Sequence, residues 1–263
     1  MALKIGLIGI IGDELKKDPW GTLEQVAEIG YDGIEGAAGI AGRVGLSVPE
    51  MKERLDELGL EAVAQGGVRL ESDDEQIKQA ISNARDIGCK YVVQYWGPVE
   101  SREQLLEEAE FFDRVGEMCA EAGLKFCYHN HNHEFATFDG EYAMDILLAN
   151  TNPDNVMAEL DIAWVTYGGA DPGQMIRKHA GRCPILHVKD VLEVPGGGVA
   201  SNDGRQETKF TEVGTGVVDL EGAVEAARES GVEWLSIEQD RMRNLSPMDS
   251  IRVSYNNLRR VVG

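Results

Sequence analysis

Three of the five histidines in the chain stand close together, in the stretch 128–135, which reads YHNHNHEF. If this stretch starts as a strand, His129 and His131 point to the same face, because side chains alternate along a strand. Imidazole groups bind metal ions and substrates, and a carboxyl group such as that of Glu134 exchanges protons. The stretch therefore predicts a metal site or an acid–base site.

Side chains of the same kinds end three later apolar runs. In chain order they are Glu159, Asp161, His187, Lys189 and Glu238. One such residue by itself is more often a helix cap, a surface ion pair or a structural histidine. Together, four consecutive runs that end in His, Asp, His and Glu supply the imidazole and carboxylate ligands of a divalent cation.

We expect a metal ion because Asp161 and Glu238 would otherwise repel each other at close range. The expected ligands are His129, Asp161, His187 and Glu238. Mixed nitrogen and oxygen ligands suit Mn²⁺, Co²⁺, Zn²⁺ or Fe²⁺ better than Ca²⁺, and Mg²⁺ is a further candidate. The sequence predicts one divalent metal ion and leaves its identity open.

Eight short apolar runs are the candidate strands that must position these residues. They are Leu3–Gly9, Asp32–Glu35, Leu60–Gln65, Cys89–Tyr95, Leu124–Asn130, Val156–Ile162, Pro184–Lys189 and Glu233–Gln239. Longer amphipathic stretches, the candidate helices, separate and follow them. They are Pro19–Ile29, Pro49–Leu58, Asp73–Ile87, Ser101–Ala122, Glu141–Leu148, Asp171–His179, Asp219–Ser230 and Ser250–Val261. This alternation predicts a parallel sheet with helical crossovers.

A glycine stands between helix and strand at several crossings, namely Gly30, Gly59, Gly88, Gly123 and Gly231. Glycine there adopts the left-handed conformation that ends a helix. Eight strand–helix units in about 250 residues predict an α/β protein, a single-domain (β/α)8 TIM barrel over residues 1–263. An open doubly wound sheet is the structural alternative, but the first turn lacks the GxGxxG fingerprint. The C-terminal ends of barrel strands meet at one mouth, where we expect the active site.

The charge of the chain limits its partners. It carries 25 basic and 46 acidic residues, a formal net charge of −21. Because such a charge repels polyanions, we expect neither nucleic acid nor a membrane as a partner. Four cysteines without a CxxC pair, no signal peptide and no membrane-spanning apolar run predict a cytoplasmic protein.

The ordered strand-end motifs resemble the xylose isomerase-like TIM-barrel superfamily, specifically its sugar phosphate isomerase/epimerase branch. The resemblance covers nearly the whole chain and rests on the set of motifs rather than on any one of them. The motifs are GIE at 33–35, YHNH at 128–131 with EF at 134–135, ELDIAW at 159–164, LHVKD at 186–190, EVGTG at 212–216 and SIEQD at 236–240.

The resemblance implies one divalent metal ion held by a Glu, an Asp, a His and a Glu from strands five to eight. Asp161, His187 and Glu238 match the last three positions, whereas His129 stands where the family has the first Glu. His131 matches a family histidine that contacts substrate. Because the ketose epimerases use the first and last Glu as their acid–base pair, the chain departs from a free-ketohexose 3-epimerase. Dimers are common in the superfamily, so a homo-oligomer is a further expectation.

We expect a metal-dependent sugar isomerase or epimerase that works through an enediolate, formed when a base removes a proton next to a carbonyl. Glu238 is the first candidate for the base. The alternatives are Glu134, Glu159 and Lys189. Burial would lower the pKa of Lys189 and make it a base or an oxyanion partner; its ordinary alternative is an ion pair with Asp190 or Glu159. A lyase or dehydratase that expels a β-oxygen from a keto-sugar, keto-glycoside or keto-inositol shares the intermediate and is the alternative function.

Further residues near the predicted strand ends are candidates for contacts with a small-molecule sugar substrate. They are Glu35, Gln94, Trp96, His131 and Trp164. The Gly-rich stretch Val191–Thr211 is long for a strand–helix turn and is a candidate lid, with a plain surface loop as the alternative. A three-metal apurinic endonuclease of the same superfamily and a non-catalytic binding protein are the remaining alternative functions.

Overall fold

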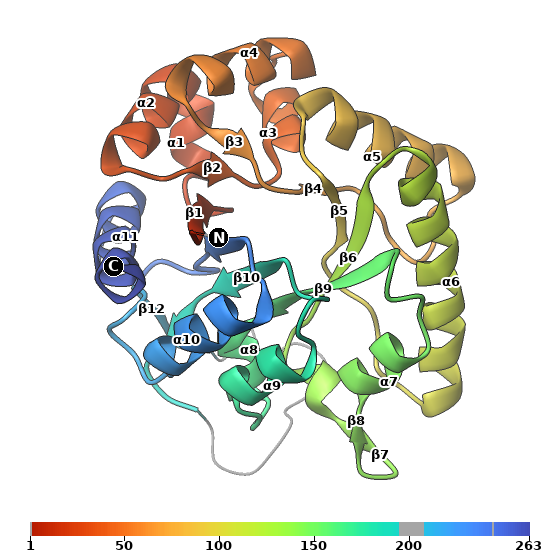
Figure 1. The fold of residues 1–263 in the computed structure, drawn as a ribbon. Coiled ribbons are helices and arrows are strands. Elements are labelled where there is room, and N and C mark those ends of the chain that lie inside the picture. The colour runs from red at the N-terminus through yellow and green to blue at the C-terminus, as the bar shows by residue number, and fades with distance from the viewer. Residues whose placement is uncertain (1, 195–207, 244) are drawn as a thin grey trace.

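The computed structural model describes residues 2–194, 208–243 and 245–263. Its centre is a sheet of nine strands in which every pair is parallel, and helices surround it (Figure 1). The strands are β1 (Lys4–Leu7), β2 (Gly33–Ile34), β3 (Glu61–Ala62), β4 (Gln65–Gly66), β5 (Tyr91–Gln94), β6 (Lys125–His129), β9 (Val156–Asp161), β10 (Ile185–Val188) and β13 (Trp234–Ile237). Their order is β3-β2-β1-β13-β10-β9-β6-β5-β4.

The two ends of this order belong to one segment of chain. Residues 63 and 64 join β3, which pairs with β2, to β4, which pairs with β5. The N–H of Val63 donates to the carbonyl of Ile34, and the N–H of Gly36 donates to the carbonyl of Ala64. The predicted barrel is therefore confirmed as nearly closed, but the predicted third strand, Leu60–Gln65, is divided into two short strands.

Helices connect the strands on the outside of the barrel (Figure 1). They are α1 (Gly12–Lys17), α2 (Pro19–Ile29), α3 (Ala37–Val44), α4 (Val48–Leu58), α5 (Asp74–Ile87), α6 (Arg102–Glu121), α7 (Ala143–Ala149), α8 (Ile162–Tyr167), α9 (Pro172–Lys178), α10 (Leu220–Ser230), α11 (Pro247–Val262) and the 3₁₀ turn η1 (His133–Phe135). The sequence predicts every helix of eleven residues or more, together with α7 and α9, and misses α1, α3 and α8. The first two residues of the predicted helix Glu141–Leu148 form a strand instead.

That strand is β8 (Glu141–Tyr142), which pairs with β7 (Thr137–Phe138) in a small antiparallel hairpin. A second small sheet pairs β11 (Asp190–Val191) with β12 (Phe210–Thr211). These two strands are the ends of the candidate lid, Val191–Thr211, whose residues 195–207 lie outside the described residues.

The glycines that the sequence places after helices have the expected conformation. Gly30, Gly59, Gly88 and Gly231 are left-handed C-caps of their helices, and Gly123 is left-handed one residue beyond the C-cap of α6. Each ends its helix and turns the chain back toward the next strand.

The inside of the barrel is filled by its own side chains. This inner cluster consists of Val63, Ala64, Tyr91, Val93, Cys127, Ile185 and Trp234. Close packing here requires a glycine at position 33, because a Cβ atom would lie 2.5 Å from the carbonyl oxygen of Glu61 and 3.0 Å from the Trp234 ring. A filled interior leaves the mouth of the barrel as the place for a site.

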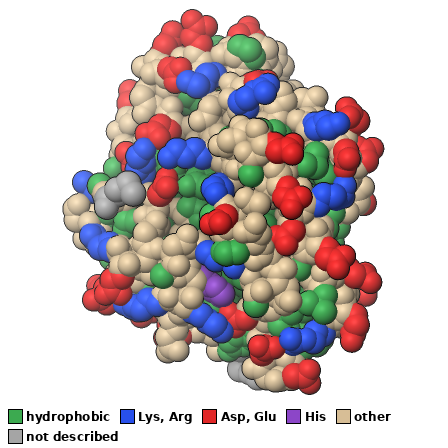
Figure 2. Space-filling view, turned by 45° about the vertical axis from the view of Figure 1, so that its right-hand side comes forward, with side chains coloured by type: hydrophobic (Ala, Val, Ile, Leu, Met, Phe, Trp, Pro, Cys, Tyr) green, Lys and Arg blue, Asp and Glu red, His purple; other side chains and the backbone are tan. Residues whose placement is uncertain are grey.

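The surface mixes both signs of charge, and the cysteines lie in the interior. In the face seen in Figure 2, acidic and basic side chains are interspersed, and no extended basic patch is visible. Among residues 2–194, 208–243 and 245–263, no helix combines the length and the apolar character needed to cross a bilayer. All four cysteines are buried free thiols.

Candidate metal and active site

A cavity of about 670 Å³ opens at the C-terminal ends of the barrel strands. Its charged lining residues are Glu35, Arg43, Arg69, Lys189, Glu238 and Asp240, accompanied by His129 and His131. This is the end at which barrel enzymes carry their active sites, as the sequence predicts.

The structure brings the four predicted metal ligands together. One donor atom each from His129, Asp161, His187 and Glu238 lies within 4.8 Å of the others. His129 and Glu238 line the cavity, whereas Asp161 and His187 are fully buried and do not reach its wall. Two imidazoles and two carboxylates form a donor set that can hold a divalent cation.

His187 also belongs to a second group of donors, formed with Glu35 and Glu159. Its Nδ1 lies 2.8 Å from Oε2 of Glu238, and its Nε2 lies 2.9 Å from Oε1 of Glu159 and 3.1 Å from both oxygens of Glu35. Burial by itself would lower the pKa of His187, but Glu35 and Glu159 outweigh burial and hold that pKa well above its ordinary value. The ring thus links the two groups.

Two carboxyl groups of the cluster titrate above their ordinary range. Burial, together with the neighbouring charge of Glu35, raises the pKa of Glu159 to about 7. Burial raises the pKa of Asp161 to about 6, against the opposing effect of Lys189. Burial is the first cause of both raised pKa values, because an ionised carboxylate loses its hydration in a volume shielded from water.

Lys189 lies within this cluster and is buried. Its Nζ is 2.8 Å from Asp240, 2.9 Å from Glu238 and 3.3 Å from Asp161. Burial would lower the pKa of Lys189, but Glu238, Asp161 and Asp240 outweigh it and raise that pKa above its ordinary value. Lys189 is therefore an ammonium ion at neutral pH.

This geometry corrects two expectations about Lys189. The expected lowering of its pKa is wrong, because its carboxylate neighbours more than offset burial. The expected ion pair with Asp190 or Glu159 is also wrong, because the carboxylates that contact Lys189 are those of Asp161, Glu238 and Asp240. Asp190 instead holds the turn after β12, by accepting hydrogen bonds from the backbone N–H groups of Val191, Gly214, Gly216 and Val218.

Glu35, expected to contact substrate, lies in the cavity wall and is held by three donors. Tyr95 donates its hydroxyl to Oε1 at 2.8 Å, Ser236 donates to Oε2 at 2.8 Å, and His187 lies on the third side. Tyr95 and Ser236 are not among the site residues that the sequence predicts. For Ser236 a signal existed, because residues two apart on a strand share a face, and Ser236 stands two residues before Glu238.

Besides Glu35, two more of the expected substrate-binding residues line the cavity. His131 packs against His129, with ring centroids 5.1 Å apart, and Trp96 is 42% exposed at the cavity wall. Gln94 does not line the cavity; it is buried and donates its amide to the carbonyl of Trp96.

The remaining expected site residues, Glu134, Glu159 and Trp164, are buried outside the cavity lining. Glu134 accepts hydrogen bonds from the hydroxyl of Tyr128 at 2.6 Å and from the backbone N–H of His131 at 2.9 Å. Burial raises the pKa of Glu134. Trp164 packs against His131, and the ammonium of Lys189 lies 5.6 Å from the centre of its ring. These side chains support the cavity wall from behind.

Comparison with known proteins agrees with this architecture. The family model described as xylose isomerase-like TIM barrel matches residues 23–261. An inosose dehydratase of Geobacillus kaustophilus is 27% identical over 206 residues, which cover 69% of this chain and 64% of that protein. The chain spans about half the length of several other inosose dehydratases that it matches.

Solved structures show the same fold. A sugar phosphate isomerase/epimerase from Parabacteroides distasonis superposes with a TM-score of 0.83 at 24% identity, covering 100% of this chain and 96% of that one. The IolI protein with a bound zinc atom superposes with a TM-score of 0.77 at 18% identity, covering 99% of this chain and 98% of that one. Because the family model matches most of the length of this chain, the chain belongs to the xylose isomerase-like TIM barrel family.

Proposed function

We propose that this chain is a metal-dependent lyase that acts on a keto-polyol or keto-sugar. The observation that carries the proposal is the meeting of four donor atoms within 4.8 Å beside the barrel-mouth cavity, which His129 and Glu238 line. The named activity of the curated relatives, inosose dehydratase, favours elimination over the isomerisation or epimerisation that the sequence analysis puts first. An inosose is accordingly the first substrate to test.

The balance of charge in the cluster supports a resident divalent cation. One ammonium group, that of Lys189, and two imidazoles, those of His129 and His187, lie there among five carboxyl groups. The carboxyl groups are those of Glu35, Glu159, Asp161, Glu238 and Asp240. The proposed ligands are His129, Asp161, His187 and Glu238. When bound, the ion would polarise the substrate carbonyl and stabilise the negative charge that develops on its oxygen.

Glu238 is the proposed base. Burial would raise its pKa, but Lys189 and His187 outweigh burial and hold the pKa of Glu238 well below its ordinary value. The carboxylate is therefore ionised at neutral pH and available to accept a proton from the carbon next to the carbonyl. Its side chain lines the cavity and is 18% exposed, so a substrate can reach it.

Lys189 has a different proposed role. Because Lys189 stays protonated, it cannot be the base. Its fixed positive charge at the cavity wall would stabilise a substrate oxygen that gains negative charge during the reaction. In the reaction, the C–H bond beside the carbonyl breaks, the C–O bond on the next carbon breaks, and a C=C bond forms between these carbons. The departing hydroxyl takes up a proton and leaves as water.

The test is to incubate the protein, supplied with Mn²⁺, Co²⁺ or Zn²⁺, with an inosose and a panel of keto-sugars in deuterated water. Elimination predicts a product lighter than the substrate by one water. A product of unchanged composition that carries deuterium next to the carbonyl would establish an isomerase or epimerase instead. Neither deuterium uptake nor a product with any member of the panel would overturn the proposed chemistry altogether.

A further inference from the structure

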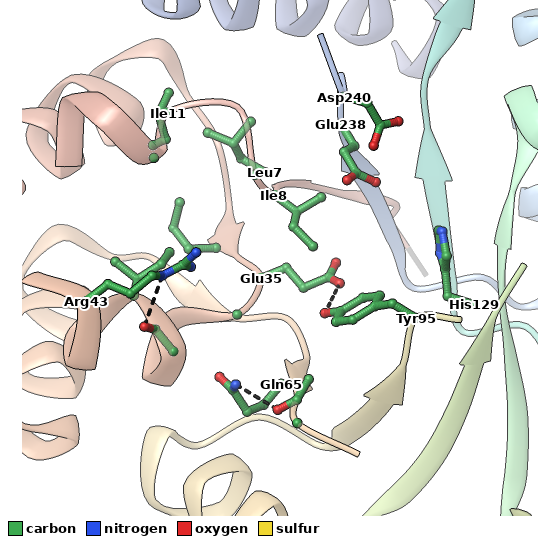
Figure 3. A pocket seen from close by; sticks show the side chains of 18 of the residues that line it. Leu7, Ile8, Ile11, Glu35, Arg43, Gln65, Tyr95, His129, Glu238 and Asp240 are labelled. Carbon is green, nitrogen blue, oxygen red and sulfur yellow. Dashed lines mark hydrogen bonds between the residues drawn. The ribbon is translucent and has the colours of Figure 1, made fainter. Parts of the chain in front are cut away.

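The cavity has a second part that the proposed chemistry does not use. Its wall there is apolar and comes from β1, the loop that follows it, α1 and α3, where the lining side chains are Leu7, Ile8, Ile11, Leu15 and Ile40. Figure 3 shows Leu7 and Ile8 between Arg43 on one side and Glu238 and His129 on the other. The apolar wall therefore continues toward the outside of the barrel from the donor cluster, which consists of His129, Asp161, His187 and Glu238.

Glycines on the same elements leave this part of the cavity open. A Cβ atom at Gly12, the first residue of α1, would meet nothing within 4 Å. A Cβ atom at Gly39, within α3, would meet only Nε2 of Gln65, at 3.7 Å. Neither glycine has a positive φ, so ordinary side chains are compatible with the backbone at both positions. The backbone therefore does not require glycine at either position, and the effect of the two glycines is to leave space in the cavity.

Arg43 stands at the far side of this wall. It lies in the last turn of α3, and its Nε donates to the carbonyl of Gly39 at 3.2 Å. This hydrogen bond ties the Arg43 side chain to its own helix at the cavity wall (Figure 3). A planar guanidinium packs well on the face of a flat ring.

We propose that the substrate carries an apolar group about the size of a benzene ring, such as the aglycone of a keto-glycoside. The sugar ring would face the donor cluster, and the apolar group would pack on Leu7, Ile8 and Ile11. This inference rests on the proposed function for the sugar end. An unsubstituted keto-polyol has no apolar surface to place against this wall, whereas an apolar substituent gains affinity in proportion to the area of its own that it buries there. The cavity volume is in the range of sites for drug-sized ligands.

The test measures binding and needs no turnover. Phenyl and methyl β-glycosides of glucose, galactose and mannose are titrated by calorimetry into the metal-supplied protein. We expect the phenyl compound of at least one sugar to bind tenfold or more tightly than its methyl partner. Gly39→Leu and Gly12→Leu should remove this phenyl advantage without weakening the methyl glycoside.

Gly42→Leu is the matched control. Gly42 lies on α3 like Gly39, a Cβ atom there also meets nothing within 4 Å, and the residue does not line the cavity. This variant should keep the phenyl advantage. Equal affinities in the wild type, no binding of any phenyl glycoside, or a phenyl advantage that persists in both lining variants would overturn the inference.

The outcome is separable from that of the proposed function. A protein that binds phenyl glycosides as described but eliminates nothing contradicts the lyase and leaves the apolar subsite standing. A protein that dehydrates an inosose but shows no phenyl advantage contradicts the subsite and leaves the lyase standing.

Discussion

His187 shows how single residues organise this site. One ring nitrogen faces Glu238, and the other faces Glu35 and Glu159. A carboxylate that accepts the second N–H of a metal-binding histidine fixes the orientation of the ring and raises its basicity. Glu35, itself held by Tyr95 and Ser236, would do this for His187 as a ligand of the proposed metal ion.

The first prediction concerns Glu35. Glu35→Gln should weaken binding of Mn²⁺ or Zn²⁺ by about 10- to 100-fold, because the amide orients His187 less strongly than the carboxylate does. Competition with a chelator of known affinity measures this change. Unaltered metal affinity in a folded variant would show that Glu35 does not act through His187.

The second prediction concerns the proposed base. Glu238→Gln should lower the rate of proton exchange next to the carbonyl by about 100-fold or more, because the amide cannot accept the proton. Glu233, which precedes the same strand, lies at the opposite end of the barrel and provides the control. Full exchange activity in Glu238→Gln, or an equal loss in Glu233→Gln, would speak against this role for Glu238.

The third prediction concerns Glu108, a buried residue of α6 that lies outside the cavity lining. Burial, together with the charge of Glu134, raises the pKa of Glu108 to about 8, against the effect of a hydrogen bond with Gln104. Since this pKa is higher in the folded than in the unfolded chain, the group destabilises the fold increasingly as pH rises from about 4.5 to about 8.

Glu108→Gln should therefore be more stable than the wild type by an amount that grows with pH and reaches about 4 kcal/mol at pH 8. Urea unfolding at pH 5, 6.5 and 8 measures the difference. Glu107→Gln, at the exposed neighbouring position, should show almost no such trend. A difference for Glu108→Gln that is independent of pH would contradict the assigned cause.

At the scale of elements, Asp161 joins the site to a helix. Its Oδ1 accepts hydrogen bonds from the N–H groups of Ala163 and Trp164 and so caps α8, while its Oδ2 faces Lys189. Asp161→Asn keeps an oxygen for the cap but loses the charge, whereas Asp161→Ala loses both. We expect both variants to lose metal binding, and the Ala variant to be about 1 kcal/mol less stable than the Asn variant.

Metal analysis and urea unfolding of the two variants measure these effects separately. Equal stability of the Asn and Ala variants would contradict the capping role. Wild-type metal affinity in the Asn variant would contradict the role of Asp161 as a ligand.

The sequence predicts the longer elements well because their signals are local and redundant. A capping residue, an amphipathic period and a terminal glycine all agree for α5, which begins after Asp73 and ends at Gly88. The short helices lack such agreement. The six residues of α8 are mostly apolar and follow a strand directly, so their sequence carries no signal that separates a helix from a continuing strand. The division of the third strand depends on its pairing with two neighbours, which no local pattern reveals.

The side-chain environment of the site could be predicted only in part. Alternation correctly grouped His129 with His131, since residues two apart share a face. The same rule speaks against an ion pair between the adjacent residues Lys189 and Asp190, which point to opposite faces. The true partners of Lys189 include Asp240, and that contact depends on how loops from different strands meet at the mouth of the barrel.

At the scale of the whole molecule, an acidic chain of net charge −21 concentrates part of its negative charge at one end of a filled barrel. The central claim of this account is that the excess is balanced by one divalent cation held by His129, Asp161, His187 and Glu238. Binding to the folded state alone stabilises it, by about 2.7 kcal/mol at a free metal concentration 100 times the Kd.

The most direct measurement is the metal content of the purified protein after dialysis against Mn²⁺, Co²⁺ or Zn²⁺, together with its thermal unfolding before and after removal of the metal. The account predicts about one ion per chain, a melting temperature that falls on chelation, and neither feature in Asp161→Asn. The central claim would be contradicted by a wild-type protein that retains no metal under any of these conditions and whose melting temperature does not change when chelator is added.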